Sequence, residues 1–133
     1  MDTLTDAELG YLASQTLGRL ATVDANGAPQ NNPVTFRYNA GLGTIDIGGH
    51  AMGASRKFRN VRANDRVAFV VDDIASFRPW RVRCVEIRGR AEALSDQEPP
   101  MPGFSREIIR VHPHRIISFG LDHGQAAAPG SGR

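Results

Sequence analysis

The chain has 133 residues, a formal net charge of +2 and a single cysteine, Cys84. This length fits one domain and is too short for an enzyme with a cleft between two domains. The small net charge argues against nucleic acid as a partner, and one cysteine excludes both an intrachain disulfide framework and a multi-cysteine zinc site. The N-terminus is acidic where a secretion signal is basic, and no apolar run has membrane-spanning length. We therefore expect a cytoplasmic protein with no membrane partner.

The first part of the chain is predicted to form a helix and a β-hairpin. Thr5 and Glu8 make a capping-box pattern ahead of an apolar helical face, and Gly18 is expected to end this helix. The pair Asn26-Gly27 lies between two alternating segments, and such a pair favours the tight turn whose twist matches its flanking strands. An antiparallel pair of strands should therefore follow the helix.

Strand-like segments dominate the rest of the chain, with a helix expected over 53–63 and a loop over the proline-rich stretch 95–105. The strand-like segments lie at 44–49, 66–73, 80–94, 107–111 and 115–121, with a His112-Pro113-His114 break between the last two. Short strands separated by turns indicate a mainly β fold with few helices, a small closed or split β-barrel. We assign residues 1–122 to this domain and expect the small, polar tail 123–133 to be disordered.

The most informative segment is 44–62, in which an alternating strand runs through a glycine-bearing turn into a helix. Ser55, Arg56 and Lys57 are the first residues of that helix. The first amides of a helix lack intrahelical partners, so a hydroxyl and two cations at the same end favour binding of an anion. The segment therefore predicts a phosphate site. The alternative is an ordinary surface helix with solvated arginines.

The same turn nearly matches a nucleotide-binding P-loop, because Gly48, Gly53 and Ser55 have the required spacing. Ala54, however, stands where that motif needs the lysine that reaches the distal phosphates. No long series of alternating strands and helices follows to build the usual parallel sheet. These two departures exclude an NTPase of that class.

The strand expected over 80–94 has apolar residues on both faces, since Trp80 lies on one side while Val85 and Ile87 lie on the other. A bulge near Cys84 would explain this change of phase. A second copy of the chain that covers the outer face would also explain it, and cyclic dimers are the commonest arrangement of that kind. We favour the homodimer.

Other reactive side chains give weaker signals. Cys84 lies mid-strand without a histidine nearby in the sequence, which indicates a small buried residue rather than a nucleophile. Asp72 and Asp73 end a strand and are typical of a turn, with a paired carboxylate near a cofactor as the alternative. His112 and His114 share one face of an extended segment but lack a third ligand, so no metal site is predicted.

Four segments, at 29–39, 48–73, 79–94 and 106–122, give the chain its resemblance to a known family. Their order and residues resemble the pyridoxamine 5′-phosphate oxidase-like flavoproteins, and most of all the actinobacterial oxidoreductases that use the deazaflavin coenzyme F420. The most specific piece is SRKFRN, which begins at Ser55. The resemblance implies an FMN-binding-like split β-barrel and a homodimer with two cofactor sites at the subunit interface. The oxidase-type members extend their C-terminal region with substrate-phosphate residues that this chain lacks, so pyridoxamine phosphate oxidase activity itself is not expected.

The resemblance also implies which residues contact the cofactor. Lys57 matches the family's phosphate-binding position, with Ser55 and Arg56 beside it. His50 falls where the family's turn passes the cofactor, and Trp80 occupies a position that approaches it from the neighbouring subunit. The matching residues of the strand that lines the flavin or deazaflavin ring are Asn32, Val34, Thr35, Phe36 and Arg37. No residue is assigned a catalytic role.

The activity implied by the resemblance is that of an oxidoreductase, which transfers a hydride between reduced coenzyme F420 and a small organic substrate. Two alternatives share the same phosphate site: an FMN-binding protein of the oxidase type, and a non-catalytic flavin or deazaflavin carrier. An excess of arginine favours F420, because its oligoglutamate tail is anionic. The arginines considered for the tail are Arg59, Arg62, Arg78, Arg81 and Arg83.

Overall fold

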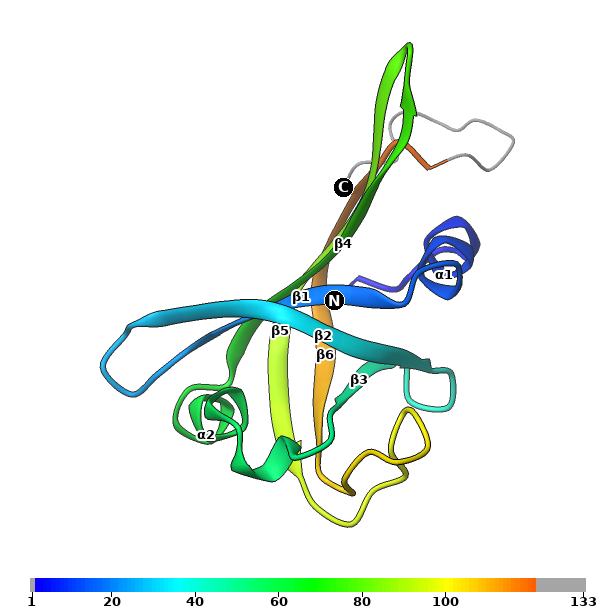
Figure 1. Cartoon of the computed structure of the whole chain (residues 1–133). Coiled ribbons are helices and arrows are strands. Elements are labelled where there is room, and N and C mark those ends of the chain that lie inside the picture. Colours follow the sequence, from blue (N-terminus) through cyan, green and yellow to red (C-terminus); the bar gives the residue numbers. More distant parts are fainter. Residues whose placement is uncertain (1, 122–133) are drawn as a thin grey trace.

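The computed structural model describes residues 2–121, so the predicted tail 123–133 lies outside the described residues. Six strands close into an antiparallel barrel in the order β1-β2-β3-β6-β5-β4, with two α-helices beside it (Figure 1). Within this described part, neither helix is long and apolar enough to cross a membrane. The elements are α1 (Asp6–Ala13), β1 (Leu17–Val23), β2 (Pro29–Asn39), β3 (Thr44–Gly48), the 3-10 turn η1 (Met52–Ala54), α2 (Arg56–Ala63), β4 (Arg66–Phe77), β5 (Trp80–Leu94) and β6 (Ile108–Phe119).

The barrel core forms because inward-facing apolar residues alternate along the strands and meet across the ladder. Val67, Phe69 and Val71 of β4 are buried, and the last two pair directly with Ile87 and Val85 of β5. Strand β3 is buried along its whole length. This packing fixes the register, because a slip of one residue would turn the apolar set toward solvent.

Helix α1 begins as the sequence predicts but ends earlier. The Glu8 amide donates to Thr5 Oγ1 at 3.2 Å and the Thr5 amide donates to Glu8 Oε1 at 2.9 Å, which confirms the capping box. The helix ends at Ala13, so the prediction that Gly18 ends it is wrong. Gly18 lies in β1, where a Cβ would come 2.5 Å from the ring of Phe69. The glycine is there for close packing.

The prediction of a break at 112–114 is also wrong, because β6 runs through these residues without interruption. The register between β6 and β5 shifts between Arg88 and Gly89, so a β-bulge takes the place of the break. Pro113 has no amide to donate to a ladder, and a bulge is one of the few sheet positions that tolerate it. The His-Pro-His sequence therefore marks a local irregularity within one strand and not the end of a strand.

The outer parts of β4 and β5 leave the barrel as a two-stranded arm, which comprises residues 72–84 (Figure 1). The predicted bulge near Cys84 is not found there, because the pairing stays in register on both sides of it, and the shift in β4 lies between Ile74 and Ser76. The mixed faces of β5 arise because its inner half lines the core while its outer half belongs to the arm. At the tip, Phe77 and Trp80 are 70% and 64% exposed.

Candidate functional site

The start of α2 is capped by a serine. Ser55 Oγ accepts a hydrogen bond from the Phe58 amide at 3.2 Å and donates one to the Met52 carbonyl at 2.7 Å. The hydroxyl proton is therefore already engaged. The amides of Arg56 and Lys57, the first two residues of the helix, have no intrahelical acceptor. These amides, rather than the Ser55 hydroxyl, are the donors open to an anion.

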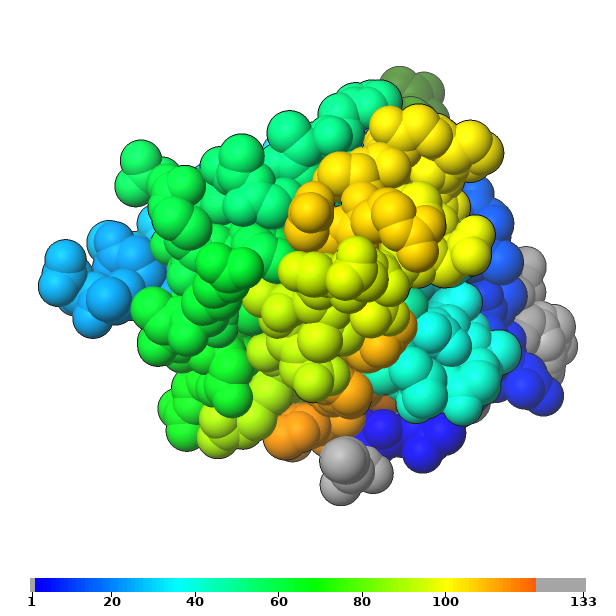
Figure 2. Space-filling view, turned by 90° about the horizontal axis from the view of Figure 1, so that it is seen from below, coloured from blue at the N-terminus to red at the C-terminus, as the bar shows by residue number. Residues whose placement is uncertain are grey.

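A pocket of about 320 Å³ opens at this end of the barrel. Strand β2, the end of β3, the turn after it and the start of α2 form most of its wall. Figure 2 shows the green part of this wall beside the yellow to golden atoms of the loop 95–105. Lys57 is half-buried and is the one lysine or arginine in the lining. The lining residues are Pro33, Val34, Thr35, Gly48, Gly49, His50, Ala51, Met52, Ser55, Lys57 and Phe104.

Five of the ten predicted site residues meet in this pocket. Pairing between β2 and β3 places Thr35 opposite Gly48, so the strand and the turn that the sequence singled out lie side by side. The helix start then adds the positive charge. The predicted residues in the lining are Val34, Thr35, His50, Ser55 and Lys57.

The structure places four of the other predicted residues away from this pocket. Phe36 packs into the barrel, with its ring centroid 5.2 Å from that of Phe69. Arg37 lines a separate pocket between β2 and α1. Arg56 is exposed and is not among the lining residues, and Trp80 lies at the tip of the arm.

Asn32, the tenth predicted residue, lies on β2 beside the pocket wall. Its buried Oδ1 accepts no hydrogen bond within residues 2–121. Because side chains alternate along a strand, Asn32 shares a face with Val34, which does line the pocket. A buried acceptor without a donor costs free energy, so a ligand donor that reaches this point would be stabilising.

Sequence reasoning missed the part that the loop 95–105 plays. Phe104 of this loop lines the pocket, and its ring centroid lies 5.0 Å from that of His50 in an edge-to-face arrangement. The loop lies against Gly48, where a Cβ would come 2.6 Å from Pro100 Cδ. That glycine is the one trace of the contact in the sequence, and it says nothing of what lies opposite.

The arginines predicted to act together on an anionic tail are split between two places. Arg59 and Arg62 lie on α2, whereas the other three lie in the arm, at the opposite end of the molecule (Figure 1). In the arm, Arg83 Nε donates to Asp73 Oδ1 at 2.9 Å, and Arg81 donates to a backbone carbonyl just after β6 at 3.2 Å. Within one subunit, the five arginines therefore do not form a single group.

The two aspartates expected in a turn lie inside β4 and form ion pairs instead. Asp72 Oδ1 lies 2.6 Å from Arg19 Nη2, and Asp73 accepts from Arg83 and, at 2.8 Å, from the Tyr11 hydroxyl. The Arg83 hydrogen bond holds the pKa of Asp73 below its usual value. Burial, together with the Asp73 contact, raises the pKa of the Tyr11 phenol well above its usual range. These groups stabilise the base of the arm.

The remaining candidates show no sign of reactivity. Burial raises the pKa of the Cys84 thiol to about 11, and Asp72 and Glu86 add to this shift, so little thiolate exists at neutral pH. His112 Nε2 lies 2.7 Å from Glu92 Oε1. Over residues 2–121, no three His, Cys, Asp or Glu side chains come together as a group that could hold a metal ion.

Comparison with known proteins agrees with this fold. The pyridoxamine 5′-phosphate oxidase family matches residues 4–119. The chain belongs to this family. A 5a,11a-dehydrotetracycline/5a,11a-dehydrooxytetracycline reductase of Streptomyces rimosus subsp. rimosus is 50% identical over 119 residues, which cover 89% of this chain and 84% of that protein.

Two solved structures extend the comparison within the pyridoxamine 5′-phosphate oxidase fold. An F420 reductase is 28% identical with a TM-score of 0.57, and the match covers 76% of this chain and 88% of that one. A conserved hypothetical protein of Mycobacterium tuberculosis is 20% identical with a TM-score of 0.69, over 97% and 96%. The predicted family and the predicted split β-barrel are thereby confirmed, and the reductase confirms the oxidoreductase class.

The pocket fits a phosphate group such as the one that a flavin carries. Two amides at the start of α2 and the half-buried Lys57 supply donors and positive charge. A Cβ at Gly49 would meet no heavy atom within 4 Å, so this part of the wall leaves open space.

Proposed function

We propose that this protein is a coenzyme F420-dependent reductase. The observation that carries the proposal is the pocket at the start of α2, in which the one lysine of the chain lies beside two helix amides. The dehydrotetracycline reductase and the F420 reductase support the activity and the cofactor. When bound, a deazaflavin supplies a hydride, because carbon replaces the flavin N5.

The chain's own residues bind and orient the cofactor in this proposal. Lys57 and the first amides of α2 hold the phosphate through charge-assisted hydrogen bonds. Val34 and Thr35 form the adjoining wall on β2, which is paired to β3 and so is rigid. A site on paired strands holds its geometry better than one on loops, and hydride transfer depends on such orientation.

We propose a polycyclic substrate with an activated carbon–carbon double bond. The support is the name of the relative from Streptomyces rimosus, which specifies a 5a,11a-dehydro compound, together with 50% identity over most of both chains. Reduction adds a hydride to one carbon of the bond and a proton to the other. An assay that monitors loss of such a substrate by absorbance, with reduced F420 in excess, tests this part of the proposal.

We also propose that the active form is a homodimer. Phe77 and Trp80 expose most of their surface at the tip of the arm, and their rings contact each other edge to face at 5.8 Å. A two-stranded ribbon is marginally stable alone in water, so a covering partner would stabilise it. In the proposed dimer, Trp80 approaches the cofactor site of the partner subunit. Light scattering at micromolar concentration tests it, and a monomer with full cofactor occupancy would contradict it.

Fluorescence titration of the apoprotein with F420 and with FMN, at matched salt concentration, tests the cofactor. We expect the dissociation constant for F420 to be the smaller one. A clear preference for FMN would replace the proposal with an FMN-binding protein of the oxidase type. Tight F420 binding without reduction of any substrate that has an activated carbon–carbon double bond would favour a non-catalytic deazaflavin carrier.

A further inference from the structure

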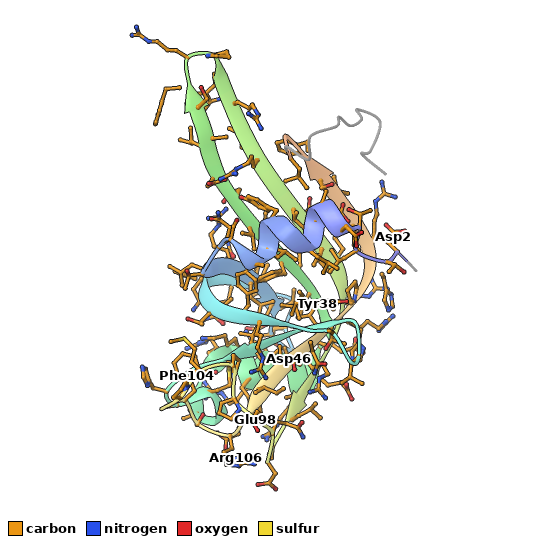
Figure 3. The ribbon with its side chains drawn as sticks, turned by 90° about the vertical axis from the view of Figure 1, so that its right-hand side faces the viewer. Asp2, Tyr38, Asp46, Glu98, Phe104 and Arg106 are labelled. Atoms are coloured by element: carbon orange, nitrogen blue, oxygen red, sulfur yellow. The ribbon has the colours of Figure 1, made fainter. Side chains whose placement is uncertain are left out.

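We propose that Phe104 is a positioning residue of the cofactor pocket, where it forms with His50 an aromatic wall against the ring-bearing part of the ligand. The inference deepens the proposed function and rests on it for the class of ligand. Nothing in the sequence pattern pointed to this residue, which lies in a proline-rich loop. Figure 3 labels it at the α2 end of the barrel, with Glu98 and Arg106 from the same stretch of chain.

The geometry of the aromatic pair leaves room for a ligand. Phe104 and His50 have ring centroids 5.0 Å apart and an interplanar angle of 81°, and both line the pocket. In an edge-to-face pair, one ring presents its edge, so its own faces remain free for another planar or apolar group. Phe104 is only half-buried and is not part of the barrel core, so core packing does not account for it.

Hydrogen bonds hold the end of the loop on the turn that forms the pocket. The Ser105 amide donates to the Gly49 carbonyl at 2.9 Å, and Ser105 Oγ accepts from the Met52 amide at 3.1 Å. The Gln97 amide donates to the Arg106 carbonyl at 2.9 Å and closes the base of the loop. Phe104 is therefore attached to the same turn that leads to Lys57.

The end of β3 fixes the position of the loop from the other side. A Cβ on Gly48 would come 2.6 Å from Pro100 Cδ and 3.0 Å from Phe104 Cδ2. Only a glycine allows the loop to sit this close. A wall held by hydrogen bonds and by close packing is preorganised, which lowers the entropy that ligand binding must overcome.

The test compares the affinities of F420, FMN and inorganic phosphate for the wild-type chain, Phe104→Ala and Phe104→Tyr. We expect Phe104→Ala to lower the affinity for both cofactors about tenfold, because aromatic contact and apolar burial are lost. The affinity for phosphate should stay unchanged. Phe104→Tyr should restore the affinity. Met101→Ala is the matched control, because Met101 lies in the same loop and is 43% exposed without lining the pocket.

A fluorescence reporter gives an independent readout. Trp80 is the only tryptophan, so a Trp80→Phe, Phe104→Trp double variant carries one indole, at the proposed wall. Its emission should be quenched by F420 or FMN and unaffected by phosphate. Cofactor binding that leaves this emission unchanged would overturn the inference.

The outcomes separate this inference from the proposed function. If the wild-type chain binds F420 and Phe104→Ala binds it equally well, the inference fails while the function stands. If the chain prefers FMN but loses FMN affinity in Phe104→Ala, the F420 function fails while the inference stands. Equal losses for cofactor and phosphate would mean that the loop only supports the fold, and binding of neither cofactor would overturn both.

Discussion

The cations of α2 and Arg83 of the arm lie at opposite ends of the molecule and differ in their partners (Figure 1). In the arm, Arg83 bonds to Asp73, and Asp72 at its base pairs with Arg19 on β1. Within residues 2–121, no carboxylate lies within 4.0 Å of any of the four cations on α2, which are Arg56, Lys57, Arg59 and Arg62. The Arg83–Asp73 ion pair stabilises the fold, whereas Lys57 lines the pocket and is open to an external anion.

The comparison explains why a count of arginines is a poor guide to a polyanion site. Asp73 and Arg83 are directly cross-strand neighbours in β4 and β5. Opposite charges at such a position stabilise a sheet without any ligand. Helix α2, in contrast, has no acidic residue at all over Arg56–Ala63, so its own sequence offers no internal partner.

The sharpest test of this difference is Lys57→Ala. If Lys57 binds a cofactor phosphate, its removal should weaken cofactor binding by about 1.5–3 kcal/mol, which is roughly tenfold to more than a hundredfold. The melting temperature should stay the same, because the side chain has no structural partner among the described residues. Titration calorimetry measures the first quantity and thermal unfolding the second. An unchanged affinity would remove the phosphate site.

The opposite pattern is expected for Arg83→Gln in the arm. This change removes two hydrogen bonds to the half-buried Asp73, so the free energy of unfolding should fall by about 1–2 kcal/mol. Cofactor affinity per folded subunit should change little. Arg81→Gln is the matched control, since Arg81 is exposed and bonds only to a backbone carbonyl. Equal free energies of unfolding for Arg83→Gln and Arg81→Gln, measured in urea, would contradict a stabilising role of the Arg83–Asp73 ion pair.

Low pH should destabilise the arm, because Asp73 loses its charge there. Helix α2 contains no acidic residue and should not contribute to this effect. The pKa of Asp73 is lowered in the folded state, so its contribution is present above the usual value of 3.8 and is lost as the pH falls through the lowered value. The difference in unfolding free energy between the wild-type chain and Asp73→Asn, about 1 kcal/mol at pH 6, should therefore shrink below pH 3.8. Urea unfolding at pH 6 and pH 3 measures it. A difference that persists at pH 3 would contradict the ion pair.

The smallest effect is expected for Arg62→Ala. The guanidinium of Arg62 lies 4.7 Å from the ring centroid of Phe58, on the last turn of α2 and away from the pocket lining. Its removal should weaken F420 binding by less than about 0.5 kcal/mol, and the effect should disappear at high salt. A loss as large as that of Lys57→Ala would mean that α2 binds anions as a whole face.

The sequence predicted those parts of the molecule that short-range chemistry determines. The capping box at Thr5 and the hairpin around Asn26-Gly27 each depend on residues within a few positions of one another, although the Gly27 amide donates to the Asp24 carbonyl and so places the turn at 24–27. The candidate phosphate site in segment 44–62 was predictable for the same reason. Its strand, turn and helix start are contiguous in the chain.

The parts that the sequence did not predict depend on pairings between distant segments. Phe104 reaches the pocket because β3 pairs with β6, which follows its loop. To predict the bulge at 112–114, one must know the register between β6 and β5. To predict the arm, one must know where β4 and β5 leave the barrel. No periodicity within a single segment carries this information.

The half-buried Lys57 gives the molecule a chemical handle. It is the only lysine of the chain, so the sequence contains one side-chain amine, and that amine lies in the pocket. A reagent that acylates amines would therefore report on occupancy of the pocket without any engineering of the protein. Protection of this one amine by a bound cofactor, read as a single mass difference on the peptide that contains it, would follow the site in a mixture as complex as a cell extract.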